Sequence, residues 1–276
     1  MHGCDFGFLD SGTGGLSYML YLKKFRPQCR CVYLADTRNF PYGEKTSEQI
    51  RECAANAAET LMNLCSPRVI VIACNTMSVT ALDSLRRRFA VPFVGTVPAV
   101  KLAASLSKTR RLGLLATRHT VSHPYTDKLI ADFASDCAVI KRGDPELVEF
   151  VERRLFSASY EERVAAVMPA VEFFKAENVD TIILGCTHFI HLAEELQAAA
   201  GSAIRVIDSR GGVMKQALKL AAQDFPAAEN AENISAPCVE DMSFYITGNA
   251  DGEGARKYQA LAEQLHIRYK TLPVRD

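Results

Sequence analysis

The sequence has no surplus of charge of either sign and no long apolar run. Its 276 residues include 32 Lys and Arg and 32 Asp and Glu, so the formal net charge is zero. A chain-wide nucleic-acid surface or a polybasic membrane anchor would need an excess of basic residues, although a local basic pocket would not. No apolar stretch approaches the roughly 20 residues of a membrane-spanning helix. We therefore expect neither nucleic acid nor a membrane among its partners.

The number of cysteines is odd. Nine cysteines cannot all pair within one chain, and a chain of this length needs no disulfides for stability. The first ten residues, MHGCDFGFLD, have no basic start followed by an apolar stretch, which is unlike a signal peptide. We expect a cytoplasmic protein with reduced thiols. Because no extension precedes the first expected strand, we also expect no regulatory site built on one.

Short apolar runs alternate with longer amphipathic patterns along the whole chain. Such alternation predicts parallel sheets covered by helices on both faces, which is an α/β fold. The expected strands cover residues 7–10, 31–36, 69–74, 92–97, 112–117, 181–186, 204–208 and 242–247. The helical patterns between them include residues 48–65, 79–89, 124–133, 160–177 and 212–222.

The chain contains an internal repeat. VIVIACNTMSVTAL, from Val69, and TIILGCTHFIHLAEEL, from Thr181, both read as apolar strand, small residue, cysteine, two polar residues and helix. GFLDSGTGGLS, from Gly7, similarly matches GLLATRHTVSH, from Gly113. The repeat predicts two pseudo-symmetric, doubly wound domains, each with a mostly parallel sheet flanked by helices.

We place the first domain at residues 1–97 plus 208–276 and the second at 98–207. The segment 225–237, which contains two prolines, is the best candidate for an exposed excursion. Ligands of open parallel sheets bind outside the carboxyl ends of the strands. All four repeated motifs lie at such ends, so we expect a site in the cleft between the domains.

Cys74 ends an expected strand and is followed by Asn75, Thr76 and a helical pattern. A helix N-terminus stabilises a thiolate and lowers the pKa of a nearby cysteine, and the two polar side chains could hold a carboxylate. The alternative is a small buried residue, because free cysteines are often buried. The repetition at Cys186 favours chemistry, since packing gives no reason to repeat the polar pair after the thiol.

Cys186 has a histidine two residues later. His188 is suited to polarising the thiol or stabilising its thiolate. Cys186, His188 and His191 could also ligate zinc, but the cluster lacks an obvious fourth ligand and the paired spacing of structural zinc sites. We therefore expect no metal.

Asp10 and Ser11 precede the glycine-rich turn 12–15. A turn of this kind can bind an anion through backbone amides, or Asp10 can cap the following helix. Thr117 and Thr120 would add hydroxyl groups to the same cleft. In the turn PYGEK, Gly43 could let the backbone approach a ligand closely.

Five further segments form a distinctive set. They are FLDSGTGGL at 8–16, LADTRNFPYGEKT at 34–46, IACNT at 72–76, VPAVKLA at 97–103 and ILGCTH at 183–188. Together they resemble a known family, the cofactor-independent glutamate racemases of the aspartate/glutamate racemase superfamily. The resemblance implies L/D-glutamate interconversion without a cofactor, supply of D-glutamate for cell-wall peptidoglycan and hence for cell shape, and a homodimer.

The resemblance also implies residue roles. Cys74 and Cys186 would be the catalytic acid/base pair, with Asp10 assisting Cys74 and His188 assisting Cys186. A further catalytic carboxylate is expected near Cys186, and Glu149 in ELVEFVE is the best candidate, although this segment departs from the family's usual sequence. The residues that would line the glutamate site are Asp10, Ser11, Pro41, Tyr42, Gly43, Asn75, Thr76, Thr117, Thr120 and Thr187.

Racemisation fits two fixed thiols, because a proton leaves one face of the α-carbon and another arrives on the opposite face. A pyridoxal enzyme would need a Schiff-base lysine, and no lysine stands in such a motif. Three alternatives stay open. They are a racemase of aspartate or another amino acid, a binding protein that closes on an acidic amino acid without reacting, and redox catalysis by the two cysteines.

Overall fold

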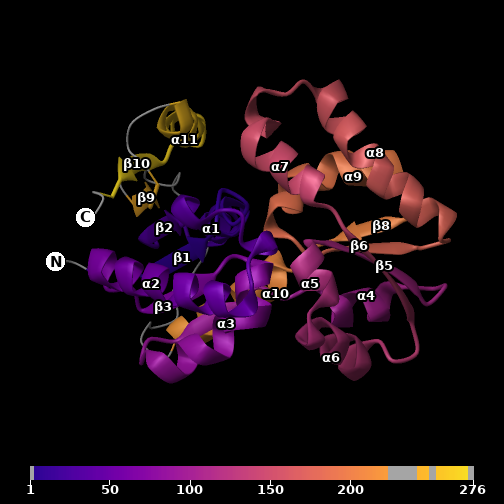
Figure 1. The fold of residues 1–276 in the computed structure, drawn as a ribbon, viewed down its shortest axis with the longest axis horizontal. Helices are drawn as coiled ribbons and strands as arrows, with labels where there is room; N and C mark the ends of the chain where they lie inside the picture. Colours follow the sequence, from indigo (N-terminus) through magenta and orange to yellow (C-terminus); the bar gives the residue numbers. More distant parts are fainter. Residues whose placement is uncertain (1–2, 223–240, 249–252, 273–276) are drawn as a thin grey trace.

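The computed structural model describes residues 3–222, 241–248 and 253–272. It contains two parallel β-sheets flanked by helices, so the predicted fold class is confirmed (Figure 1). The first sheet has the order β10-β9-β2-β1-β3-β4 and the second has the order β6-β5-β7-β8. The strands are β1 (Phe6–Asp10), β2 (Cys31–Ala35), β3 (Val69–Ile72), β4 (Phe93–Gly95), β5 (Arg111–Ala116), β6 (Ala138–Gly143), β7 (Thr181–Leu184), β8 (Arg205–Ile207), β9 (Met242–Ile246) and β10 (Arg268–Thr271).

Helices cover both faces of each sheet because the central strands are apolar on both sides. In β1, Phe8 packs toward α1 and α10, whereas Leu9 packs toward α2 and α3. The second sheet lies between α4 and α6 on one face and α7, α8 and α9 on the other. The helices are α1 (Leu16–Phe25), α2 (Ser47–Cys65), α3 (Asn75–Arg88), α4 (Val100–Leu106), α5 (Arg118–Ser122), α6 (Pro124–Phe133), α7 (Pro145–Arg153), α8 (Tyr160–Ala176), α9 (Ala193–Ala200), α10 (Arg210–Ala221) and α11 (Glu253–Gln264).

The internal repeat is visible in the strand order. The order β2-β1-β3-β4 recurs as β6-β5-β7-β8, so that β1 corresponds to β5 and β3 to β7. The backbone nitrogen of Ala73 donates to Leu9, and that of Gly185 donates to Leu115, each at 2.7 Å. Cys74 and Cys186, one residue further along, therefore occupy equivalent positions at the carboxyl ends of equivalent strands.

The chain passes from the first sheet to the second after β4 and returns to the first sheet after β8. Helix α10 then packs against α1, β3 and β4 of the first half. Segment 225–237 lies outside the described residues. Of the helices that the structure describes, none combines the length and apolar character needed to cross a membrane.

The expected strands did not include β6 and β10, and one expected helix begins earlier in the structure. Strands β6 (AVIKRG) and β10 (RYKT) contain several polar residues because each lies at the edge of its sheet. Helix α3 begins at Asn75 rather than at Val79, because Cys74 itself is the N-cap residue. The polar pair after the thiol thus forms the first turn of the helix.

Candidate active site

One pocket lies where the carboxyl ends of the two sheets meet. Of the predicted site residues, Asp10 and Thr120 lie fully buried behind the pocket wall and the others line the pocket. The lining residues are Ser11, Phe40, Pro41, Tyr42, Gly43, Glu44, Cys74, Asn75, Thr76, Thr117, Arg118, Pro145, Val148, Glu149, Cys186, Thr187 and His188.

Cys74 is a buried thiol at the start of α3. Its Sγ lies 4.0 Å from Ser11 Oγ, which in turn lies 3.4 Å from Asp10 Oδ1. Burial raises the pKa of Cys74 well above its ordinary value, and the negative charge of Asp10 raises it further. The environment therefore favours the neutral thiol at this position.

Asp10 is a fully buried carboxylate held by several donors. Its Oδ1 accepts from the backbone nitrogen of Ser11 (2.7 Å), and its Oδ2 accepts from that of Gly15 (2.6 Å). The hydroxyl groups of Tyr33 (3.2 Å) and Thr187 (3.4 Å) also donate to Oδ2. Burial raises the pKa of Asp10, against the opposing effects of the His188 charge and the backbone donors. Asp10 thus links the loop after β1 to the loop after β7.

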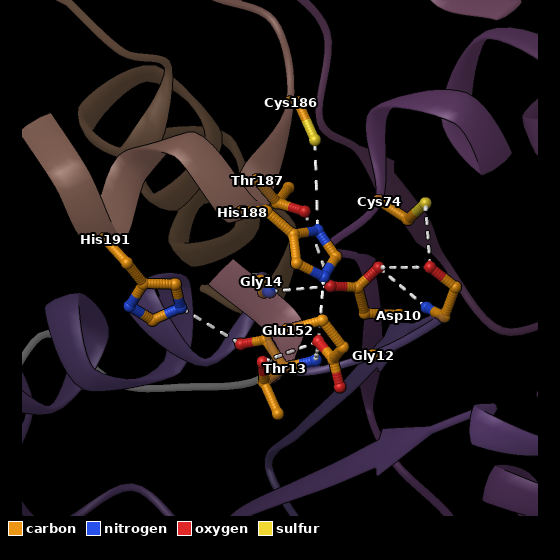
Figure 2. Close-up of polar contacts among 12 residues, drawn as sticks. Asp10, Gly12, Thr13, Gly14, Cys74, Glu152, Cys186, Thr187, His188 and His191 are labelled. Carbon is orange, nitrogen blue, oxygen red and sulfur yellow. Dashed lines mark hydrogen bonds and ion pairs between the residues drawn. The ribbon is translucent and has the colours of Figure 1, made fainter. Parts of the chain in front are cut away.

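Cys186 has a different partner. Its Sγ lies 3.8 Å from His188 Nδ1, and His188 Nε2 lies 2.9 Å from Glu152 Oε2 (Figure 2). Burial alone would lower the pKa of His188, but the hydrogen bonds to Cys186 and Glu152 outweigh it and raise the pKa well above 6.5. His188 is therefore a buried imidazolium next to the thiol, and it supplies the positive charge that a thiolate needs.

The carboxylate that contacts His188 is Glu152, not Glu149. Glu149 lies at the pocket edge with 61% of its side chain exposed, and it pairs with Arg153 at 2.9 Å. Glu152, three residues later on α7, is 2% exposed. Burial opposes its ionisation, but the hydrogen bond from His188 lowers its pKa to about 2.

Helical periodicity could have identified Glu152. In α7, Leu147, Val148 and Val151 are buried, and position 152 continues this face of the helix. Glu149 lies beyond the edge of this buried face, and its side chain is exposed. The local sequence hides the signal because three glutamates recur at intervals of three residues in ELVEFVE.

The glycine-rich turn binds anionic groups, but these are the side-chain carboxylates of Asp10 and Glu152 rather than a ligand. The backbone nitrogen of Gly15 donates to Asp10, and Thr13 donates to Glu152 Oε2 through its backbone nitrogen (2.9 Å) and its hydroxyl (2.7 Å). A Cβ at Gly14 would lie 2.6 Å from the backbone nitrogen and from Nδ1 of His188. The glycines therefore let the first half approach the loop after β7 of the second half very closely.

Three threonine hydroxyls meet at the pocket wall formed by Thr76 and Thr117. Thr76 Oγ1 lies 3.0 Å from Thr117 Oγ1 and 3.3 Å from Thr120 Oγ1. Beside them, Asn75 donates through Nδ2 to the Thr96 carbonyl at 3.1 Å. Its Oδ1 is buried and has no hydrogen-bond partner among the described residues. The pocket wall thus offers a free acceptor, which suits an ammonium group.

The PYGEK turn comes from the first half and packs against α5 of the second. Tyr42 is buried, and its hydroxyl donates to Asp36 Oδ2 at 2.6 Å. A Cβ at Gly43 would lie 3.2 Å from Thr117 Cβ. The predicted close approach at Gly43 is therefore to the other half of the protein.

The zinc alternative does not match the side-chain directions. His188 spans Cys186 and Glu152, whereas His191 Nε2 donates to the Thr13 carbonyl at 3.1 Å. Burial lowers the pKa of His191 to about 4, so it is neutral. Within residues 3–222, 241–248 and 253–272, no group of three or more His, Cys, Asp or Glu could hold a metal ion.

The site thus combines two buried thiols in one pocket, each with its own carboxylate network.

The chain as a whole is similar to characterised proteins. The family model described as Asp/Glu/Hydantoin racemase matches residues 21–217. A glutamate racemase of Treponema pallidum is 37% identical over 265 residues, which cover 96% of this chain and 95% of the relative. A glutamate racemase of Pectobacterium carotovorum is 41% identical over 228 residues, which cover 82% and 79%.

Solved structures show the same fold. Escherichia coli glutamate racemase, in complex with L-glutamate and the activator UDP-MurNAc-ala, superposes with a TM-score of 0.83 at 30% identity and covers 99% of this chain and 100% of its own. The Thermus thermophilus glutamate racemase, in complex with beta-chloro-D-alanine, gives a TM-score of 0.74 at 26% identity and covers 99% and 97%.

Proposed function

Because the chain belongs to the Asp/Glu/hydantoin racemase family, we propose that it interconverts L- and D-glutamate with Cys74 and Cys186 as the two bases. The observation that carries this proposal is the equivalence of the two thiols. They lie at corresponding strand ends of two similar sheets and line the same pocket. Relatives named glutamate racemase, at 37–41% identity, support glutamate as the substrate.

In the proposed reaction, a thiolate at one cysteine removes the proton from the α-carbon. The neutral thiol of the other cysteine delivers its proton to the opposite face, so that the two cysteines exchange protonation states. The number of protons on the enzyme is unchanged. Hydrogen bonds and dipoles that are already in place stabilise the carbanion-like state between the two transfers.

The two networks favour different resting states. Burial and Asp10 favour the neutral thiol at Cys74, so we place the thiolate of the resting enzyme at Cys186, where His188 is the neighbouring group. The resting enzyme is then ready for the enantiomer whose α-proton faces Cys186. Product formation leaves the thiolate at Cys74, whose Sγ lies 4.0 Å from Ser11 Oγ.

Substrate binding is assigned to the polar groups of the pocket wall. Asn75 Oδ1 would accept a hydrogen bond from the substrate ammonium, since it has no partner among the described residues. The hydroxyls of Thr76, Thr117 and Thr187, together with backbone amides, would hold the carboxylates. Ser11, Pro41, Tyr42 and Gly43 complete the wall.

The decisive test is racemisation by purified protein without added pyridoxal phosphate and in the presence of a metal chelator. The circular dichroism signal of L- or D-glutamate should decay to zero as the racemate forms. Aspartate measured in parallel should react much more slowly. A reaction that required pyridoxal phosphate, or a clear preference for aspartate, would refute the proposal. In D2O, product glutamate should carry deuterium at the α-carbon, whereas a binding protein would leave that proton in place.

The cellular role follows from the same resemblance. We propose that the enzyme supplies D-glutamate for peptidoglycan, and hence for cell-wall formation and cell shape, in a reducing cytoplasm that keeps both thiols reduced. Its expression should remove the D-glutamate requirement of a bacterium that lacks its own racemase. We also propose a homodimer, which sedimentation equilibrium would test.

A further inference from the structure

We propose that Tyr258, on α11, is a positioning residue that orients Glu152 toward His188. The inference rests on the proposed function, in which His188 assists Cys186. It concerns the helix near the C-terminal end of the chain, and none of the sequence motifs points to this helix.

The contact is a hydrogen bond between the two halves of the protein. The Tyr258 hydroxyl donates to Glu152 Oε1 at 2.7 Å. The other oxygen, Oε2, accepts from His188 Nε2 and from both donors of Thr13. Both carboxylate oxygens are thus bonded, and Tyr258 holds Oε1 so that Oε2 points at the imidazole.

The location of Tyr258 argues for an indirect role. It does not line the pocket, so it has no contact with the proposed substrate site. Helix α11 belongs to the first half and lies beside β9 and β10, across from α7 (Figure 1). The ring of Tyr258 packs edge-on against the Phe244 ring, with the ring centroids 6.1 Å apart. The ring therefore anchors the residue in the first half while the hydroxyl reaches the second.

Tyr258 is also suited electrostatically to act as a permanent donor. Burial raises its pKa, and the Glu152 charge raises it further, so the hydroxyl stays protonated at any working pH. Besides Tyr258, the charged groups that act on Glu152 are His188 from the loop after β7 and Lys257 from α11. The Glu152 charge also acts on Tyr33 of β2 and on the neutral His191. Tyr258 binds Oε1, the carboxylate oxygen that His188 does not contact.

Loss of the hydroxyl should weaken the support for a thiolate at Cys186. With one donor fewer, Glu152 attracts the shared proton of His188 more strongly and is free to rotate away from the imidazole. Both changes reduce the positive charge next to Cys186. They do not reach Cys74, which is served by Asp10 and Ser11.

The test compares Tyr258→Phe with Tyr269→Phe. Tyr269, on β10, packs against the same Phe244 ring at 5.8 Å, and its buried hydroxyl has no hydrogen-bond partner among the described residues. It is therefore a matched control for the loss of one aromatic hydroxyl in this cluster. We expect Tyr258→Phe to lower kcat about tenfold with little change in KM, and Tyr269→Phe to leave both unchanged.

A second measurement does not depend on racemisation. Iodoacetamide labelling at different pH values, followed by peptide mass spectrometry, reports the reactivity of each thiol. In Tyr258→Phe the midpoint of Cys186 labelling should move to higher pH, while the midpoint for Cys74 stays in place. Equal midpoints in Tyr258→Phe and Tyr269→Phe would overturn the inference.

A double-mutant cycle with Glu152→Gln separates positioning from a general loss of packing. If Tyr258 acts through Glu152, adding Tyr258→Phe to Glu152→Gln should change kcat by less than about twofold. The inference would be refuted if the effects of the two substitutions on kcat multiplied in the double variant. It would also be refuted if the loss of kcat in Tyr258→Phe only followed a lowered thermal midpoint. An inactive wild type whose Cys186 midpoint still depends on Tyr258 would refute the proposed function alone.

Discussion

His188 Nε2 and Glu152 Oε2 lie 2.9 Å apart, with both side chains almost completely buried. Glu152 also accepts two hydrogen bonds from Thr13 and one from Tyr258, which both belong to the first half. The pair is therefore the point at which the contact between the two halves meets the chemistry proposed for Cys186. This arrangement has consequences for stability, for rate and for the tolerance of the glycine-rich turn.

The buried pair should give the protein a characteristic pH dependence of stability. The pKa of Glu152 is lowered from its ordinary value of 4.5 to about 2, so its contribution is present above pH 4.5 and is lost as the pH falls toward 2. The pKa of His188 is raised, so its contribution is present below pH 6.5 and is lost as the pH rises through the higher folded value. Glu152→Gln should therefore reduce both the acidic and the basic loss of stability in a plot of the free energy of unfolding against pH. Denaturant titrations of wild type and variant across this range test this, and parallel curves would contradict it.

Glu152 and Glu149 should differ strongly in their effect on rate. Glu152→Gln removes the charge that stabilises the His188 imidazolium, so we expect kcat to fall by about tenfold or more. Glu149→Gln changes an exposed ion pair with Arg153 and should alter kcat by less than about threefold. Steady-state racemisation in both directions measures the difference. A larger effect at position 149 would show that the wrong carboxylate had been assigned.

Each of the two proposed bases should be essential. Cys74→Ala and Cys186→Ala should each lower racemisation by at least about a thousandfold, because each leaves one face of the α-carbon without a base. Cys137→Ala is the control, since this thiol lies on the second half away from the pocket. Near-native racemisation by either of the first two variants would rule out the two-base mechanism.

The glycine-rich turn should tolerate no side chain at Gly14. A Cβ there would lie 2.6 Å from the backbone of His188 and from its ring, so Gly14→Ala should cost about 1–3 kcal/mol of stability and much of the activity. Gly212→Ala is the control, because a Cβ at this helical position meets nothing within 4 Å. It should be neutral or stabilising by up to about 1 kcal/mol. Thermal unfolding of the two variants would show whether the cost is specific to Gly14.

Much of the fold was predictable because buried parallel strands are continuous apolar runs. The strands from β1 to β5, with β7, β8 and β9, all lie where the pattern indicates. The edge strands β6 and β10 carry charged and polar residues, and a run such as RYKT does not show from its local sequence that it pairs with β9.

The pocket lining was predictable where its residues stand in local motifs and not where contacts are long-range. The residues that follow β1, β3 and β7 line one pocket, with Cys74 and Cys186 among them. Tyr258 and Glu152 are far apart in the sequence and meet only through packing of the two halves. The purpose of the glycines was also hidden, because the carboxylates that the turn binds come partly from the other half.

The recurrence of β2-β1-β3-β4 as β6-β5-β7-β8 relates the two halves by a rotation, whereas the two enantiomers of an amino acid are related by reflection. A chain of L-residues cannot build a mirror plane, and the equivalent position of Asp10 in the second half is Ala116. The approaches to the two faces of a bound α-carbon therefore differ in energy. Enantiomers have equal free energies in water, so kcat/KM must be equal in both directions. The asymmetry of the protein can then appear only as matched differences in kcat and KM.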